Sequence, residues 1–147
     1  METLKLYLDN CCFNRPYDEQ VNLIIQMETE AKLNIQDAIK AGEFLLLWSF
    51  VLDYENAANP FLDVRNRIIE WKYLAIADCD LSEDITNKSR ELMKLGLRQM
   101  DASHLACAIY LGADYFLTTD KKILNKVITD VTVMNPIDFI RRYADAK

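Results

Sequence analysis

Short apolar runs alternate with longer amphipathic segments along this chain. Five such runs occur, at residues 4–8, 44–48, 74–77, 115–118 and 131–134. Runs of this length, rich in leucine, aromatic and β-branched side chains, are typical of strands. The run 44–48 is continuously apolar, as expected for a strand that is covered on both faces, whereas 4–8 alternates at Lys5. We therefore predict about five strands.

Segments with helical periodicity fill the intervals between these runs. The longest helix is expected from about Asp18 to Ala41, before Gly42. Its apolar stripe consists of Val21, Ile24, Ile25, Ala31, Ile35, Ala38 and Ile39. Further helices are expected near residues 49–59, 60–73, 82–95, 101–111, 121–126 and 137–143. The alternation of strands and helices predicts an α/β fold of three layers, with a central parallel sheet between helices.

The composition narrows the class of protein. Because 51% of the residues are apolar, the chain is expected to fold as a single domain over residues 1–147. A net charge of −6 argues against a broad nucleic-acid-binding surface, although a local basic rim or a bound metal can outweigh it. The sequence has no signal peptide and no apolar run long enough for a membrane span, so we expect a cytoplasmic protein with no membrane partner. The four cysteines lack zinc-type spacing and are expected to be reduced thiols.

Four acidic residues stand at the ends of strands or within helices that border the apolar layer. Asp9 follows the first strand and Asp120 follows the run 115–118, whereas Asp101 opens a helix. Glu55 lies on the apolar face of a short helix. Sites in parallel sheets form at the carboxyl ends of the strands, so these acids are candidates for one shared site. Taken singly, each acid is better explained as a helix cap or a turn residue.

A cluster of four carboxylates would be suited to binding metal. Hard divalent cations such as Mg²⁺ and Mn²⁺ prefer oxygen ligands of this kind. A bound cation can lower the pKa of a water molecule and can neutralise charge on a phosphate during an in-line displacement. The predicted cluster is therefore compatible with hydrolysis of phosphate esters.

Three segments resemble the PIN domain, which is the fold of the VapC-type toxin ribonucleases. They are LYLDNCCFNRP, SFVLDYEN and LRQMDASHLACAIYLGADYFLTTDKKIL. The resemblance spans nearly the whole chain, and it implies a metal-dependent endonuclease that acts on single-stranded RNA. It assigns the catalytic and metal-binding roles to Asp9, Glu55, Asp101 and Asp120, with Mg²⁺ or Mn²⁺ as the cofactor. It also implies a small antitoxin protein as a partner. Relatives often dimerise, and the first long helix carries apolar residues beyond its core stripe, such as Leu23, Met27 and Leu33, so we expect a homodimer.

The resemblance and the local charges suggest further residues for substrate binding. Thr118 matches a small polar residue that lines the site in the family. Many relatives have Ser or Thr soon after the first Asp, where this chain has Asn10 and two cysteines; Asn10 could still reach a ligand. Arg15 and Lys121 are candidates for neutralising RNA phosphates, although exposed basic residues usually serve solubility. His104, the only histidine, is better explained as a hydrogen-bonded structural residue than as a substrate contact.

Two other functions are compatible with parts of the sequence. A PIN-like module could bind RNA or a protein without catalysis, but a binding role does not need four crowded carboxylates. A phosphotransfer domain could use Asp9 as the phosphate acceptor. Phosphatases that resemble haloacid dehalogenases carry a second acid two residues after the acceptor, and Cys11 stands there in this chain. The phosphotransfer alternative is therefore the weaker one.

Overall fold

The computed structural model describes residues 3–146. A four-stranded parallel sheet has the order β2-β1-β3-β4, so β1 lies inside the sheet. The strands are β1 (Lys5–Leu8), β2 (Leu45–Leu47), β3 (Tyr115–Leu117) and β4 (Thr132–Met134). In register, Leu6 of β1 is opposite Leu46 on one side, and Tyr7 is opposite Phe116 on the other.

The expected strand at residues 74–77 is the one departure from the predicted sheet. Leu74 ends a 3-10 turn instead, and the only strand-like residue is Ala77, which forms an isolated bridge with Leu47. The backbone of this segment still bonds to β2, since the Ile76 amide donates to Leu46 and the Trp48 amide donates to Ala77. Because Leu74 belongs to the 3-10 turn, too few extended residues remain between Leu74 and Ala77 to form a fifth strand.

Helices and 3-10 turns connect the strands, and no helix within residues 3–146 is long and apolar enough to cross a bilayer. Their bounds are α1 (Asn10–Asn14), η1 (Arg15–Tyr17), α2 (Leu23–Lys40), α3 (Phe50–Ala57), α4 (Leu62–Ile69), η2 (Glu70–Leu74), α5 (Glu83–Met93), α6 (Gln99–Tyr110), α7 (Lys121–Leu124) and α8 (Pro136–Ala146).

The long second helix begins later than the periodicity predicts. Residues 10–17 fold into α1 and η1, and Pro16 lies in η1. Asn22 then caps α2, because its side chain accepts a hydrogen bond of 2.9 Å from the Ile25 amide. The expected stripe therefore starts too early: Val21 and Ile24 are exposed.

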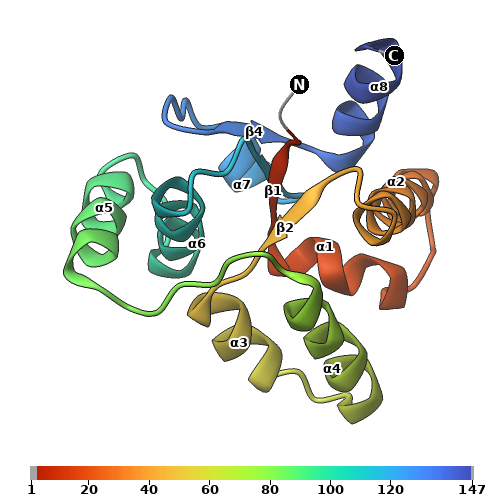
Figure 1. The fold of residues 1–147 in the computed structure, drawn as a ribbon, viewed down its shortest axis with the longest axis horizontal. Coiled ribbons are helices and arrows are strands. Elements are labelled where there is room, and N and C mark those ends of the chain that lie inside the picture. Colours follow the sequence, from red (N-terminus) through yellow and green to blue (C-terminus); the bar gives the residue numbers. More distant parts are fainter. Residues whose placement is uncertain (1–2, 147) are drawn as a thin grey trace.

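The helices cover both faces of the sheet. In Figure 1, α5 and α6 lie on one side of the strands and α1 and α2 lie on the other. The helix next to the sheet, α6, is buried on most of its circumference because α5 covers its outer side. The strands fill the centre of the core with fully buried side chains, among them Leu6, Leu8, Leu46, Leu47, Phe116 and Leu117. This arrangement directs the carboxyl ends of β1, β2 and β3 toward one edge of the sheet.

Candidate metal centre at the carboxyl edge of the sheet

Asp9 ends the interior strand and lies at the centre of this edge. It caps α1 by accepting a hydrogen bond of 2.8 Å from the Asn10 amide through Oδ1. Its other oxygen, Oδ2, accepts a hydrogen bond of 2.8 Å from the Thr118 hydroxyl just past β3. Because only 6% of Asp9 is exposed, both oxygens have fixed directions. The cap and the candidate site thus use the same carboxylate.

Glu55 approaches Asp9 from α3, and His104 lies between the two acids. The imidazole Nε2 atom of His104 contacts the Glu55 carboxylate directly and lies 3.6 Å from Asp9 Oδ1. One potential ligand atom from each of these three residues lies within 4.8 Å of those of the other two. This trio is the most compact group of metal-binding side chains among residues 3–143.

His104 is held from behind by a buried chain of hydroxyl groups. Its Nδ1 atom lies 2.7 Å from the Tyr7 hydroxyl, which lies 2.6 Å from the Ser49 hydroxyl. Burial raises the pKa of Tyr7 well above its usual value, so this phenol remains neutral and can donate or accept a hydrogen bond. His104 thus has the hydrogen-bonded environment that was expected for it. Its Nδ1 atom bonds to Tyr7, and its Nε2 atom faces Glu55 and Asp9.

Asp101 and Asp120 are joined by an arginine that the sequence analysis did not single out. Nε of Arg98 lies 3.2 Å from Asp101 Oδ2, and its Nη2 lies 3.6 Å from Asp120 Oδ2. Burial raises the pKa of Asp101; Arg98 opposes this shift, while the negative charges of Asp9 and Asp120 add to it. The charges of both strand-end acids, Asp9 and Asp120, therefore influence the pKa of Asp101. Asp120 also caps α7 by accepting from the Lys122 amide at 2.9 Å.

Arg98 carried a signal in the sequence that could have identified it. It stands three residues before Asp101 at the start of a helix, where opposite charges at this spacing meet. Such pairs are common on solvent-exposed helices, so the spacing by itself did not indicate a site. The additional contact with Asp120 depends on the tertiary structure.

The polar residues around Asp9 line its Oδ2 side. Thr118 is fully buried, and its hydroxyl also accepts a hydrogen bond of 3.1 Å from the Asp120 amide. The Cys11 thiol lies 3.5 Å from Asp9 Oδ2 and 3.4 Å from the Thr118 hydroxyl. The side-chain oxygen of Asn10 is buried and has no hydrogen-bond partner in the described part of the chain. Thr118 thus orients Asp9, while the Asn10 oxygen is left available to a ligand.

The two basic candidates for substrate binding, Arg15 and Lys121, differ in how strongly other side chains hold them. Arg15 is held by Glu28, 3.2 Å away, and donates a 2.7 Å hydrogen bond to the Thr119 hydroxyl. Its guanidinium therefore braces the loop after β3. Lys121 is exposed at the first position of α7, directly after Asp120.

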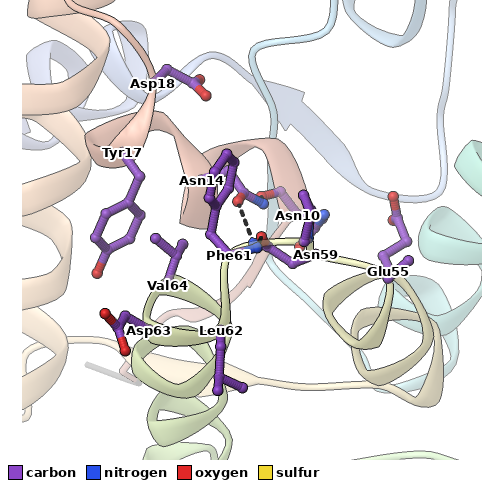
Figure 2. Close-up of a pocket in the computed structure, with 12 residues that line it drawn as sticks. Asn10, Asn14, Tyr17, Asp18, Glu55, Asn59, Phe61, Leu62, Asp63 and Val64 are labelled. Atoms are coloured by element: carbon purple, nitrogen blue, oxygen red, sulfur yellow. Dashed lines mark hydrogen bonds between the residues drawn. The ribbon is translucent and has the colours of Figure 1, made fainter.

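A cavity of about 770 Å³ opens beside Glu55. Figure 2 shows Asn10, Asn14 and Asn59 grouped together, with Glu55 apart from them, and the Asn59 amide donates to Asn14 at 3.2 Å. The α3–α4 connection supplies Asn59 and Phe61 to the lining of this cavity. Glu55 is the only one of the four candidate acids that lines this cavity. The carboxylate group therefore lies at one end of the cavity, and amide and aromatic groups extend away from it.

The residues present fit a divalent cation. Within the trio, the carboxylates of Asp9 and Glu55 provide hard oxygen donors, and the unpartnered Asn10 oxygen is a further one. Asp101 and Asp120 lie outside this close group, and Arg98 pairs with both of them. Nε2 of His104 adds a nitrogen donor, which suits a transition metal better than Mg²⁺. The hydrogen bond between His104 Nδ1 and the Tyr7 hydroxyl is the kind of outer support that fixes the orientation of a metal-binding imidazole.

Comparison with known proteins gives a structural match and no sequence match. No protein-family model and no curated protein matches the sequence. A chain in the crystal structure of VapBC2 from Rickettsia felis, bound to a DNA fragment from its promoter, superposes with a TM-score of 0.58 at 14% identity. The match covers 90% of this chain and 98% of that chain. At such low sequence identity, the superposition is informative about the fold alone. It confirms the predicted PIN-like α/β fold, with four strands in place of about five.

Proposed function

We propose that this protein belongs to the PIN-domain family and is an endoribonuclease that hydrolyses phosphodiester bonds of single-stranded RNA with Mg²⁺ or Mn²⁺. The observation that carries the proposal is the close trio of Asp9, Glu55 and His104 at the carboxyl edge of the sheet. The Arg98 pairs with Asp101 and Asp120, and the effect of Asp9 on the pKa of Asp101, support including those two acids. A fold similar to that of a chain in a VapBC complex supports it.

In this proposal, the four acids Asp9, Glu55, Asp101 and Asp120 are the catalytic and metal-binding residues. A cation held by them would lower the pKa of water and neutralise charge on the scissile phosphate. The chain's own residues fix the carboxylates: Thr118 orients Asp9 through its hydroxyl, and His104 positions Glu55.

The substrate-binding residues are proposed from their positions around the acids. Lys121, exposed beside Asp120, would neutralise a phosphate next to the scissile one. Asn10 would contact the strand beside Asp9 through its unpartnered oxygen. Thr118, which is fully buried, would contribute by orienting Asp9. Arg15 would contribute through the Thr119 loop that it braces, with any phosphate contact made by the remaining part of its guanidinium.

The test is cleavage of single-stranded RNA by the purified protein. We expect cleavage with Mg²⁺ or Mn²⁺ and none with EDTA. Asp101→Asn should remove most of the activity, because loss of one ligand displaces the cation. Asp114→Asn is a matched control, since Asp114 is exposed and bonds to the Lys5 amide. Cleavage that is undiminished in Asp101→Asn, or that persists in EDTA, would indicate a contaminating nuclease or another site.

One observation favours a second candidate, a PIN-like module that binds RNA or a protein without cleaving it. The acids already have partners within the chain, because His104 contacts Glu55 and Arg98 contacts both Asp101 and Asp120. A binding module of this kind would retain RNA in EDTA and leave it intact in Mn²⁺. Measuring binding and cleavage on the same RNA therefore separates the two candidates.

The proposal extends to the toxin half of a toxin–antitoxin pair in the cytoplasm. The neighbour in fold is part of a VapBC complex, which supports a small antitoxin as a partner. A homodimer is proposed from the exposed apolar side chains of α2, among them Leu23 and Met27. Co-expression with the product of an adjacent small open reading frame tests the partner. We expect the two proteins to co-purify and RNA cleavage to be suppressed in the complex. Unchanged cleavage in the presence of that product would argue against it being the antitoxin.

A further inference from the structure

Lys32 is a buried cation that the proposed nuclease site does not use. It lies on the inner face of α2, and only 1% of the residue is exposed. No hydrogen bond or ion pair joins its ammonium group to another side chain within residues 3–143. Its close neighbours are aromatic rings, with Nζ 5.1 Å from the Phe13 centroid and 5.6 Å from the Trp71 centroid. Lysine is rarely buried to this extent without an anionic partner.

The surroundings of Lys32 disfavour its charge. Burial, opposed by Cys12 and assisted by the neighbouring Lys40, lowers its pKa to about 7. Nζ of Lys40 lies 5.1 Å from the centroid of the Trp71 ring that Lys32 also contacts. The ammonium groups of both lysines therefore lie over the same indole ring. The weak negative charge on the face of the ring offsets their mutual repulsion only partly. An anion placed beside the two ammonium groups would reduce their repulsion and would give each of them an oppositely charged partner.

A cavity of about 400 Å³ leads to this pair of lysines. It lies between α2 on one side and α4 with η2 on the other, and its walls include Lys32, Lys40, Arg67 and Trp71. Glu70 is the only acid among its lining residues. Three cations against one acid is an unusual balance in a chain with a net charge of −6. The cavity is thus a local positive site in an acidic protein.

The three cations have no acidic partners of their own. Among the described residues, no salt bridge involves Lys32, Lys40 or Arg67, whereas Arg15, Lys72, Lys88 and Arg98 are all paired with acids. Lys40 and Arg67 come from different helices, so their charges converge from two walls. Phosphate groups are recognised by such convergent lysine and arginine side chains.

We propose that this cavity, between α2 and the α4–η2 segment, is a binding site for a phosphate group, with Lys32 at its floor and Lys40 and Arg67 at its mouth. The phosphate can come from a free mononucleotide or from an RNA strand. Tyr17 lines both this cavity and the one beside Glu55, so a strand that leaves the acids along α1 would reach the lysines. The site itself does not depend on nuclease activity.

The test is the effect of phosphate ligands on the full-length protein in EDTA, where cleavage would not interfere. The probes are inorganic phosphate, adenosine 5′-monophosphate and a short oligoribonucleotide with hydroxyl groups at both ends, each compared with chloride at equal ionic strength. We expect at least one probe to raise the melting temperature and to bind by calorimetry. Response to the first two alone identifies a free or terminal phosphate, and response to the oligoribonucleotide identifies the RNA backbone.

Two variants test the assignment to this cavity. Lys32→Met keeps the length and apolar stem of the side chain, so it should fold, and it should weaken binding of the responding probe at least about tenfold. The double variant Lys40→Gln/Arg67→Gln should weaken binding without changing the floor. Lys94→Gln, which removes an exposed cation directly after α5 and outside the lining of this cavity, is the control and should bind like the wild type. No response of the wild type to any probe, or equal responses of wild type and Lys32→Met, would overturn the proposal.

Discussion

At the scale of single residues, two of the candidate acids combine a local capping role with a place in the proposed site. Asp9 caps α1 and Asp120 caps α7, which is what their positions at the ends of strands predict. The same placement at the carboxyl edge of a parallel sheet brings them to the region of Asp101 and Glu55. The cap explanation and the site hypothesis are therefore compatible.

Replacing Asp101 by Asn should separate stability from function. Burial and the nearby acids disfavour the charge of Asp101, so the neutral variant should melt at or above the wild type in EDTA. Mn²⁺ should stabilise the wild type by about 2.7 kcal/mol at a hundredfold excess over its dissociation constant, and the variant much less. The measurement is four melting curves, with each protein in EDTA and in Mn²⁺. A variant that melts lower in EDTA and gains equally from Mn²⁺ would show that Asp101 is structural.

Lys32 should make the free energy of unfolding depend on pH. Its pKa is about 7 in the folded chain and 10.5 in the unfolded chain, because burial lowers it. Between these values the unfolded chain binds more protons, so this residue makes stability rise with pH across that window. Below about pH 7 both states are protonated, and the penalty for burying the charge is constant.

Lys32→Met should remove that dependence. The variant should be more stable than the wild type by roughly 1–4 kcal/mol near pH 6, and the difference should shrink toward pH 10. Urea unfolding of both proteins across this range measures it, and the difference between them cancels the other titrating groups. A difference that stays constant with pH would mean that Lys32 keeps an ordinary pKa in the folded protein.

At the scale of elements, the helix caps determine where the site residues point. Ser49 caps α3, which carries Glu55, by accepting from the Leu52 amide at 3.4 Å. The same hydroxyl contacts Tyr7, which supports His104. Ser49 therefore links the start of α3 to the imidazole that contacts Glu55. Ser82 caps α5 in the same way, with the Ile85 amide at 3.3 Å, and it has no contact with the acids.

This pair of caps provides a matched experiment. Ser49→Ala and Ser82→Ala should each lower the free energy of unfolding by about 0.5–2 kcal/mol. Only Ser49→Ala should also weaken Mn²⁺ binding, because it frees Tyr7 and thereby His104 and Glu55. Chemical unfolding and calorimetric Mn²⁺ titration are the two measurements. Equal Mn²⁺ affinity in both variants would mean that the hydroxyl chain has no part in positioning the ligands.

At the scale of the whole molecule, the outer face of α2 carries more apolar surface than a solvated helix needs. Leu23 is 67% exposed, Met27 41% and Leu33 44%. Apolar side chains grouped on an exposed helix mark interaction surfaces. They are the basis of the expected homodimer.

We expect light scattering at tens of micromolar, the usual concentration for such measurements, to give the mass of a dimer. Leu23→Glu should shift the protein toward the monomer, since it places a charge in the expected interface. Glu83→Gln, at an exposed position of α5, is the control and should not change the mass. A wild-type monomer at this concentration would contradict the expected assembly.

The sequence determined the elements that local physics controls. Runs of apolar side chains predicted the four observed strands, since a strand buried on both faces requires continuous hydrophobicity. Strand-end placement predicted the positions of Asp9 and Asp120, because parallel strands end at one edge. The start of α2 and the fifth strand were predicted wrongly. There, short 3-10 turns at residues 15–17 and 70–74 competed with the expected elements.

The tertiary structure decided which side chains complete the candidate site. His104 contacts Glu55 across 49 residues and Tyr7 across 97, and no local pattern encodes such pairings. Arg98 joins Asp101 to Asp120 only because α6 and the end of β3 meet at the same edge. Lys32 occupies a position on α2 where the amphipathic pattern marks a buried side chain, yet its charge becomes significant only once Phe13 and Trp71 surround it. Burial changes the energy of a charge through all of its neighbours in space, and those neighbours come from every part of the chain.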